Sequence, residues 1–236
     1  MSDAEVSDAE VRSAYAGRAE EYAALFGSID ATHPSDRQLI ADWARPLDGP
    51  VIDAGCGPGH WTNYLIENGI SAEGIDLVPE FIAHAETVFP MVPFRLASLT
   101  DLGVPDGYAS GILAWYSLIH LDPADVPAVL RELARSTAPG GGLLLGFFEG
   151  DRLQQFPHAV TAAYTWPIDE ATRLLAAAGF TTLACHSRKD PGHRPHAAIV
   201  ARRDTQMAAQ AISPSSSPGR CGTGLFHDSR RAQRCI

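Results

Sequence analysis

The chain has 236 residues, 45% of them hydrophobic, which suits one α/β domain of moderate size with a buried core. A formal net charge of -10 disfavours nucleic-acid partners, because few cations are available to neutralise a phosphate backbone. No apolar run approaches the roughly 18–20 residues of a membrane span, and the acidic N-terminus is unlike a targeting leader. We therefore expect a cytoplasmic monomer or homodimer with no membrane partner.

The four cysteines, at positions 56, 185, 221 and 235, include no close pair. This spacing indicates neither a disulfide framework nor a zinc site. We expect reduced thiols and no bound metal.

The first 46 residues predict two helices. Apolar residues recur at helical intervals through residue 26. Gly27 to Pro34 interrupts this pattern, and Ser35 is then expected to cap a second helix that runs to about Trp43.

From residue 47 to residue 203, short apolar strands alternate with helical patterns. The expected strands are 50–54, 71–76, 92–96, 109–115, 142–148, 180–186 and 196–202. The expected helices are about 60–68, 79–88, 123–136 and 168–178. Several strands are apolar on both faces, as in central parallel strands that helices cover on both sides. The pattern predicts an α/β fold with a doubly wound, mostly parallel, seven-stranded sheet and helices on both faces.

The last segment, residues 204–236, has no apolar periodicity and contains the run Ile-Ser-Pro-Ser-Ser-Ser-Pro-Gly. Its composition predicts a disordered tail.

Three glycines, Gly55, Gly57 and Gly59, alternate directly after the strand that begins at Val51. Glycine permits positive φ and close approach of a ligand to the backbone. A dinucleotide site needs Gly-x-Gly-x-x-Gly, but counting from Gly55 the third glycine falls on His60. A phosphate-binding P-loop needs a lysine, and none is nearby.

The run Asp53-Ala-Gly-Cys-Gly-Pro-Gly59 resembles the first motif of the class I S-adenosylmethionine (SAM)-dependent methyltransferases, Asp/Glu-x-Gly-x-Gly-x-Gly. The resemblance implies a Rossmann-like methyltransferase fold, SAM as cofactor and S-adenosylhomocysteine (SAH) as its product. It places Gly55, Cys56 and Gly57 beneath the methionine portion and ribose, with Asp53 near the ammonium end. It also implies that residues 1–46 form a helical lid on a SAM-binding domain spanning 47–203.

Further segments extend the resemblance. Asp76, at the end of the second strand, would accept hydrogen bonds from the ribose hydroxyls, although it could instead cap the helix that starts at Pro79. Leu77 would border the adenine. Ser98 stands where the family often has an acid, so Ser98 and the Leu99 backbone become the candidates for the adenine amine. Trp115 follows the fourth strand, where cofactor-facing residues are common in the family.

Two tyrosines of the first helix, Tyr15 and Tyr22, resemble a lid segment that closes over SAM. Core packing would also place two tyrosines seven residues apart on one helix face.

Methyl transfer from a sulfonium needs alignment and exclusion of water, and it needs a base only when the acceptor must lose a proton. His120 is the leading base candidate, although it could merely pack at the start of the following helix. Tyr22 is the second catalytic candidate. Further candidates for the pocket are His33, Asp36, Glu149 and Tyr164.

The predicted function is methyl transfer from SAM to an oxygen, nitrogen or aromatic carbon of a small molecule such as a phenol, indole or amine. The acidic chain, and the absence of an Asn/Asp-Pro-Pro-Tyr motif after the fourth strand, favour a small acceptor over nucleic acid. One alternative is a protein of the same fold that binds SAM or SAH without transfer, as a cyclase or regulator. A nicotinamide-dependent oxidoreductase is a second alternative, which the glycine spacing disfavours.

Overall fold

A computed structural model describes residues 27–158 and 162–205, together with four separate positions before residue 27. The expected tail, apart from its first two residues, and most of the first expected helix lie outside the described residues. A short 3-10 helix, η1 (Ile29–Ala31), precedes α3 (Pro34–Ala44). The first cap differs from the prediction: His33, not Ser35, is the N-cap of α3, because its ring accepts a hydrogen bond from the Ser35 amide and Pro34 occupies the first helical turn.

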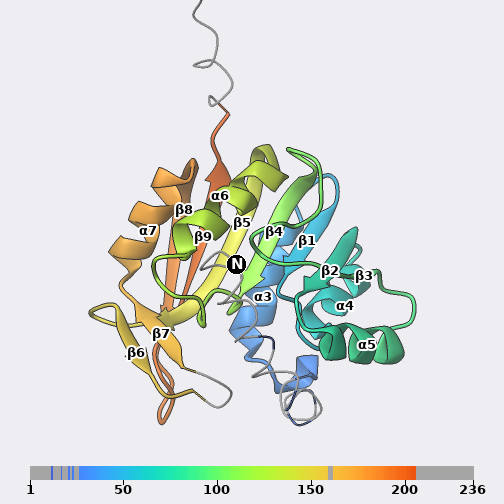
Figure 1. Cartoon of the computed structure of the whole chain (residues 1–236), viewed down its shortest axis with the longest axis horizontal. Coiled ribbons are helices and arrows are strands. Elements are labelled where there is room, and N and C mark those ends of the chain that lie inside the picture. The colour runs from blue at the N-terminus through green and yellow to red at the C-terminus, as the bar shows by residue number, and fades with distance from the viewer. Residues whose placement is uncertain are drawn as a thin grey trace, which may run out of the picture.

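The fold is α/β, and its sheet is mostly parallel, as predicted (Figure 1). Its first half contains β1 (Val51–Ala54), β2 (Ala72–Asp76), β3 (Phe94–Leu96) and β4 (Ala109–Trp115). Its second half contains β5 (Thr137–Glu149), β6 (Gln154–Phe156), β7 (Ala163–Trp166), β8 (Phe180–Arg188) and β9 (His196–Arg203). The order is β3-β2-β1-β4-β5, with β9 pairing antiparallel to β5 and β8 antiparallel to β9.

The described chain has nine strands, so the expected count of seven was wrong. The two additional strands, β6 and β7, form a hairpin between β5 and the next helix. They are only three and four residues long, and their polar and aromatic composition lacks a clear alternating pattern. The hairpin is held because β5 extends past the end of β4, and its last two residues, Phe148 and Glu149, pair with β7.

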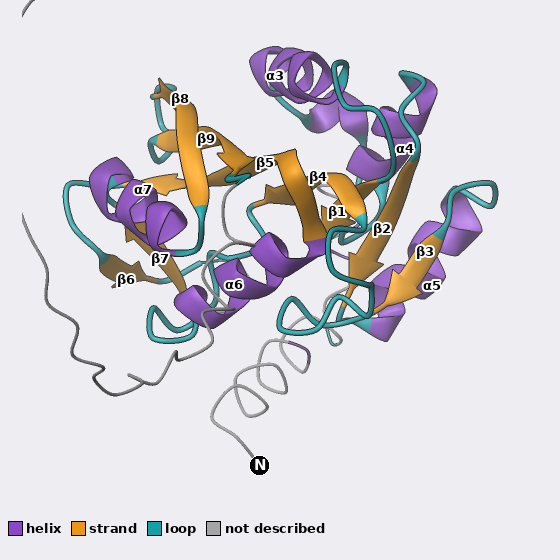
Figure 2. Cartoon of the chain, turned by 90° about the horizontal axis from the view of Figure 1, so that it is seen from above, coloured by secondary structure: helices purple, strands orange, loops and turns teal. Residues whose placement is uncertain are grey.

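The helices are α4 (His60–Glu67), α5 (Pro79–Val88), α6 (Val126–Ser136) and α7 (Ile168–Ala177). Helices α3 and α4 cover one face of the sheet, and α6 and α7 cover the other (Figure 2). Alternate residues of the central strands therefore enter different cores. Ile52 and Ile112 pack with α6, whereas Val51 and Leu113 pack with α3 and α4. This burial on both faces explains the continuous apolar strands.

No helix in the described part of the chain is both long enough and apolar enough to cross a bilayer.

Candidate functional site

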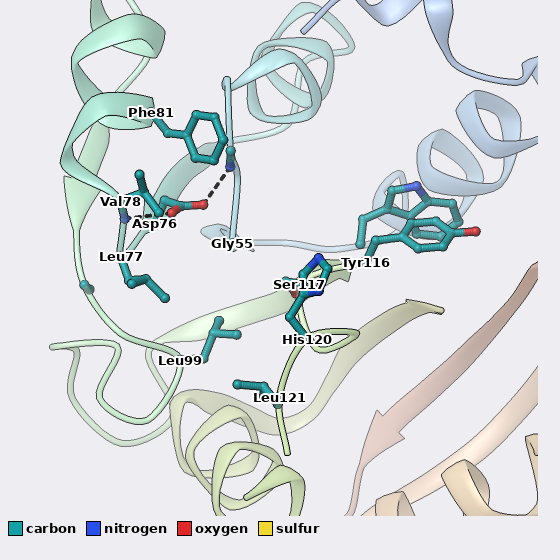
Figure 3. A pocket seen from close by; sticks show the side chains of 13 residues that line it. Gly55, Asp76, Leu77, Val78, Phe81, Leu99, Tyr116, Ser117, His120 and Leu121 are labelled. Carbon is teal, nitrogen blue, oxygen red and sulfur yellow. Dashed lines mark hydrogen bonds between the residues drawn. The ribbon is translucent and has the colours of Figure 1, made fainter. Parts of the chain in front are cut away.

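The carboxyl ends of β1, β2 and β4 enclose a cavity at the edge of the sheet where strand order changes, with β1 between β2 and β4. We call it the glycine-loop cavity. Its polar side is lined by Gly55, Gly57, Asp76, Ser117 and His120, and its apolar side by Leu77, Val78, Phe81, Ala97, Leu99 and Leu121 (Figure 3). Trp115 and Tyr116 complete the lining.

The loop between β1 and α4 requires its glycines for different reasons. Gly55, Gly57 and Gly59 all have positive φ, at 80°, 52° and 88°. A Cβ atom added at Gly55 would lie 2.4 Å from the Ser117 Cβ, whereas one added at Gly57 would meet nothing within 4 Å. Gly55 therefore permits close packing of the loop on the segment just after β4, and Gly57 presents bare backbone to the open space of the cavity.

Asp76, the last residue of β2, joins two loops of the cavity. Its Oδ2 accepts a hydrogen bond from the Gly57 amide at 2.9 Å, and its Oδ1 accepts one from the Val78 amide at 2.9 Å. Both expected roles are therefore compatible: the carboxylate lines the cavity and also fixes the backbone just before α5. Burial raises the pKa of Asp76 to about 6, against the opposing effect of these backbone donors.

Asp53 and Cys56, two further residues of the motif, do not line the glycine-loop cavity. Asp53 is 1% exposed and accepts a hydrogen bond from the Thr62 hydroxyl at 2.7 Å, so it supports the loop from behind. Burial raises its pKa to about 7, and the nearby carboxylate of Asp76 adds to this rise. Cys56 is buried, and burial raises the pKa of its thiol, so it is protonated at neutral pH.

Hydrophobic side chains on the apolar side of the cavity form a slot that suits a flat ligand. Leu77 and Leu99, both expected beside adenine, lie across from each other in Figure 3. Ser98 is not part of the lining: its hydroxyl bonds the Thr100 hydroxyl at 2.8 Å and accepts from the Thr100 amide at 3.1 Å. Asp101, three residues further along the chain, accepts a hydrogen bond from the Gly103 amide at 2.9 Å.

Trp115, the last residue of β4, and the residues that follow it form the wall opposite Asp76. Tyr116 is the only described residue other than glycine with positive φ, at 60°. Its ring points away from Asp76 in Figure 3, and its hydroxyl is hydrogen-bonded to Nδ1 of His196 on β9. A strained conformation of this kind persists only where its surroundings hold it, and such residues concentrate at functional sites.

Ser117 and His120 bring two polar groups to the cavity. The Ser117 hydroxyl is buried and has no hydrogen-bond partner in the described structure. His120 Nδ1 lies 2.8 Å from the Ala162 carbonyl oxygen, and only a protonated Nδ1 can donate to that oxygen. Burial lowers the pKa of His120 to about 4, so the ring is neutral at pH 7 and its Nε2 is the basic nitrogen.

The cavity carries negative charge that no basic side chain offsets. No lysine or arginine is among its described lining residues, whereas Asp76 lines it and Asp53 lies behind it. Such a site disfavours phosphate groups and favours a cationic ligand. Within the ranges that the structure describes, no three histidine, cysteine or acidic side chains come close enough together to hold a metal ion.

The remaining predicted residues lie elsewhere. Tyr15 and Tyr22 fall outside the described residues. His33, just before α3, and Asp36, on α3, line a second cavity of about 350 Å³ between α3 and the β8–β9 pair. We call it the α3–β8 cavity. Glu149 is hydrogen-bonded to Ser187 of its wall, whereas Tyr164, on β7, belongs to neither cavity.

Residues of the glycine loop, including Cys56, also line a third cavity of about 230 Å³ together with His60. Trp115 and Tyr116 line all three cavities, which therefore meet at the end of β4.

Sequence reasoning missed six lining residues, which are Val78, Phe81, Ala97, Tyr116, Ser117 and Leu121. Four of them, Val78, Ala97, Tyr116 and Ser117, lie within two residues of a strand end, which was the available signal. Phe81 and Leu121 lie further along the chain and had no such signal.

Residues 51–141 match the model of the methyltransferase domain family. A malonyl-[acyl-carrier protein] O-methyltransferase of Erwinia billingiae is 31% identical over 131 residues, covering 55% of this chain and 49% of the relative. A trans-aconitate 2-methyltransferase of Methylobacterium nodulans is 34% identical over 145 residues, covering 58% of this chain and 53% of the relative. The chain thus spans about half the length of these curated relatives.

Among solved structures, the 1,6-didemethyltoxoflavin-N1-methyltransferase of Burkholderia thailandensis, with bound 1,6-didemethyltoxoflavin and SAH, superposes with a TM-score of 0.68. It is 22% identical, and the match covers 86% of this chain and 91% of that one. This likeness supports the fold, and the family match lies on the glycine loop and the strands beside it. Residues 51–141 of this chain are therefore similar to a methyltransferase domain, and the chain has the α/β fold of that methyltransferase structure.

Proposed function

We propose that this chain transfers a methyl group from SAM to a small-molecule acceptor. The observation that carries the proposal is the glycine-loop cavity, where bare backbone at Gly57 faces a carboxylate at Asp76 with no lysine or arginine in the described lining. SAM bears a sulfonium cation and no phosphate, so it matches this charge. A pyrophosphate would be repelled.

The residues of the cavity divide the binding of SAM among them. Asp76 keeps both carboxylate oxygens close to the cavity and would receive the ribose hydroxyls there. Leu77, Leu99 and Phe81 would enclose the adenine in an apolar slot. The loop at Gly55 and Gly57 would pass beneath the rest of the ligand.

When bound, SAM supplies an electrophilic methyl group whose transfer disperses charge. The protein must therefore hold the acceptor in line with the methyl group and exclude water. Trp115 and Tyr116 are placed for this task, because they line both the glycine-loop cavity and the α3–β8 cavity.

His120 is the proposed base for an acceptor that must lose a proton. Its Nδ1–H is held by the Ala162 carbonyl, and its neutral state leaves Nε2 able to take a proton. Tyr22 stays a prediction, since it lies outside the described residues.

Tritium-labelled SAM tests the proposal. The wild-type protein should form SAH and labelled product with at least one member of a panel of phenols, indoles and amines. Gly55→Ala should abolish this transfer, and Asp48→Asn, an exposed change before β1, should leave it intact. Tight binding of SAH without transfer to any acceptor would instead favour a cofactor-binding protein that does not transfer methyl groups.

A further inference from the structure

The α3–β8 cavity shares Trp115 and Tyr116 with the glycine-loop cavity, and its other walls come from α3, β8 and β9. Its volume of about 350 Å³ suits a small ring compound. Tyr116 joins the two spaces physically, because its ring leaves the glycine-loop cavity and its hydroxyl bonds His196 in this second lining. A ligand here would therefore lie against the same aromatic wall as the methyl donor.

The described lining contains one arginine, Arg188, and no lysine, and this guanidinium is already paired with carboxylates. Its Nη1 lies 2.6 Å from Asp36 Oδ1, and its Nη2 lies 3.2 Å from Asp36 Oδ2. Nη1 also donates to Ser35 Oγ at 2.9 Å, and Nε lies 2.8 Å from Asp190 Oδ2. A carboxylate ligand normally binds arginine through two parallel hydrogen bonds to the guanidinium. Here Asp36 occupies that geometry.

The charge around this cavity is negative. Its lining and the side chains bonded directly to it contain three carboxylates, Asp36, Asp190 and Glu149, against the single guanidinium of Arg188. Burial and the nearby guanidinium lower the pKa of His196, so its imidazole does not add positive charge at pH 7. A second anion would therefore be repelled, and a group that donates N–H hydrogen bonds would be attracted.

The walls add a preference for a ring. The rings of Trp115 and Tyr116 pack edge to face with their centroids 5.5 Å apart, and Leu39 lies in the same lining. Aromatic faces beside a negative field favour an amine or a ring N–H, through stacking and cation–π attraction.

We propose that the α3–β8 cavity binds the methyl acceptor, and that this acceptor is a nitrogen-bearing aromatic compound, an amine or ring N–H, rather than a carboxylate. The inference rests on the proposed function. Before the transfer, the bound nitrogen loses a proton to water or to an imidazole of the lining, which makes its lone pair available. The lone pair then forms the N–CH3 bond as the C–S bond breaks, and the sulfonium becomes a neutral thioether.

The test compares two probes that share one ring. Tryptamine and indole-3-acetate are titrated by calorimetry into the wild-type protein saturated with SAH. Tryptamine should bind at least tenfold more tightly than indole-3-acetate. Equal affinities, tighter binding of the acid, or no binding of tryptamine while SAH binds would each overturn the inference.

Asp36→Asn is the discriminating variant, because it removes a carboxylate and releases the guanidinium of Arg188. It should weaken tryptamine binding and tighten indole-3-acetate binding, each by about tenfold as one lost or gained charge contact implies. Asp48→Asn, the matched control on the exposed segment before β1, should change neither affinity. If Asp36→Asn does not fold, Asp190→Asn should produce the same shift to a smaller extent, and no shift there would also overturn the inference. Failure of SAH to bind the wild type would contradict the proposed function itself, so the two failures are distinguishable.

Discussion

The glycine-loop cavity and the α3–β8 cavity are formed in different ways. The glycine-loop cavity comes from short segments that directly follow β1, β2, β3 and β4, and Asp76 ties two of these segments together. The α3–β8 cavity joins residues about 150 positions apart, through contacts such as that between Arg188 and Asp36. The first is a local consequence of strand ends and glycines, whereas the second depends on how distant elements pack.

Under the proposed function, this difference separates cofactor binding from acceptor choice. A cavity built from strand ends keeps its shape as long as the sheet forms, and the same cofactor can be held by many relatives of the fold. A cavity built from α3, β8 and β9 can change its charge through a few substitutions without disturbing the sheet. The following predictions test whether the two cavities are separable in this way.

The largest effect is expected from Gly55→Ala. Gly55 and Gly69 have nearly the same φ, 80° and 81°, but only at Gly55 would a Cβ atom collide with a neighbour, Ser117. Gly69→Ala should lower the free energy of unfolding by about 1 kcal/mol through backbone strain alone. Gly55→Ala should cost roughly 2 kcal/mol more from overpacking and should also weaken SAH binding by more than tenfold.

Urea unfolding and calorimetry measure the two variants. Equal losses of stability in both would show that the contact between Gly55 and Ser117 does not constrain the loop.

The next effect in size is the loss of SAH affinity in Asp76→Ala. Removing charged hydrogen bonds to ribose should cost about 1–3 kcal/mol of binding free energy, or roughly 5- to 150-fold in affinity. Asp101→Ala, in the loop that follows β3, is the control and should change affinity less than twofold, since the Asp101 carboxylate accepts a hydrogen bond from the Gly103 amide of its own turn. Unchanged affinity in a folded Asp76→Ala protein would remove Asp76 from the binding site, and an equal loss in Asp36→Asn would break the separation of the two cavities.

A third prediction concerns pH. The pKa of Asp76 is raised to about 6 and that of Asp53 to about 7, so both ionise between pH 5 and 8 in the folded protein. Ionisation favours cationic SAM over neutral SAH, so the ratio of their affinities should rise across this range, by up to about tenfold per unit of pKa shift on binding.

The same two carboxyl groups affect stability with the opposite sign. Because their folded pKa values lie above the unfolded value of 3.8, the folded state binds more protons between about pH 4 and 7. Their contribution to the stability of the ligand-free protein should therefore decline as pH rises through this window. Asp53→Asn should reduce that decline in urea titrations at pH 5 and pH 7.5.

For the binding prediction, a SAM-to-SAH affinity ratio that stays constant with pH would argue against a negatively charged glycine-loop cavity.

The smallest effect is expected at Ser117, whose buried hydroxyl has no partner in the described structure. Ser117→Ala should leave the free energy of unfolding unchanged or raise it by up to about 1 kcal/mol, while SAH affinity falls about three- to tenfold. Ser110→Ala is the reverse control, because the Ser110 hydroxyl donates to the Pro50 carbonyl at 3.1 Å far from the cavity. That change should lower stability and leave affinity intact. A Ser117→Ala protein with unaltered affinity would show that the hydroxyl does not serve the ligand.

The cofactor side could be predicted from sequence because its chemistry is local. The alternating glycines, and Asp76 at a strand end, are positions whose geometry follows from the strand–turn–helix unit that contains them. Asp53 and Ser98 show the limit of that reasoning. Each lies near a strand end as expected. Asp53, however, bonds Thr62 beneath the loop, and Ser98 bonds Thr100 in its own turn.

The α3–β8 cavity could not be predicted in the same way. His33 and Asp36 were candidates, but nothing in their spacing identifies Arg188 or His196 as neighbours, since β8 and β9 reach them only through antiparallel pairing at the far end of the sheet. The β6–β7 hairpin was missed for a related reason, because its strands are short and are stabilised by the overhanging end of β5.

Calorimetric titrations of SAH and of NADH into the wild-type protein, and of SAH into the Asp76→Ala protein, test SAM binding most directly. We predict one saturable SAH site per wild-type chain, weaker binding of SAH to Asp76→Ala, and no saturable heat with NADH. Saturable binding of NADH together with none for SAH would contradict this prediction.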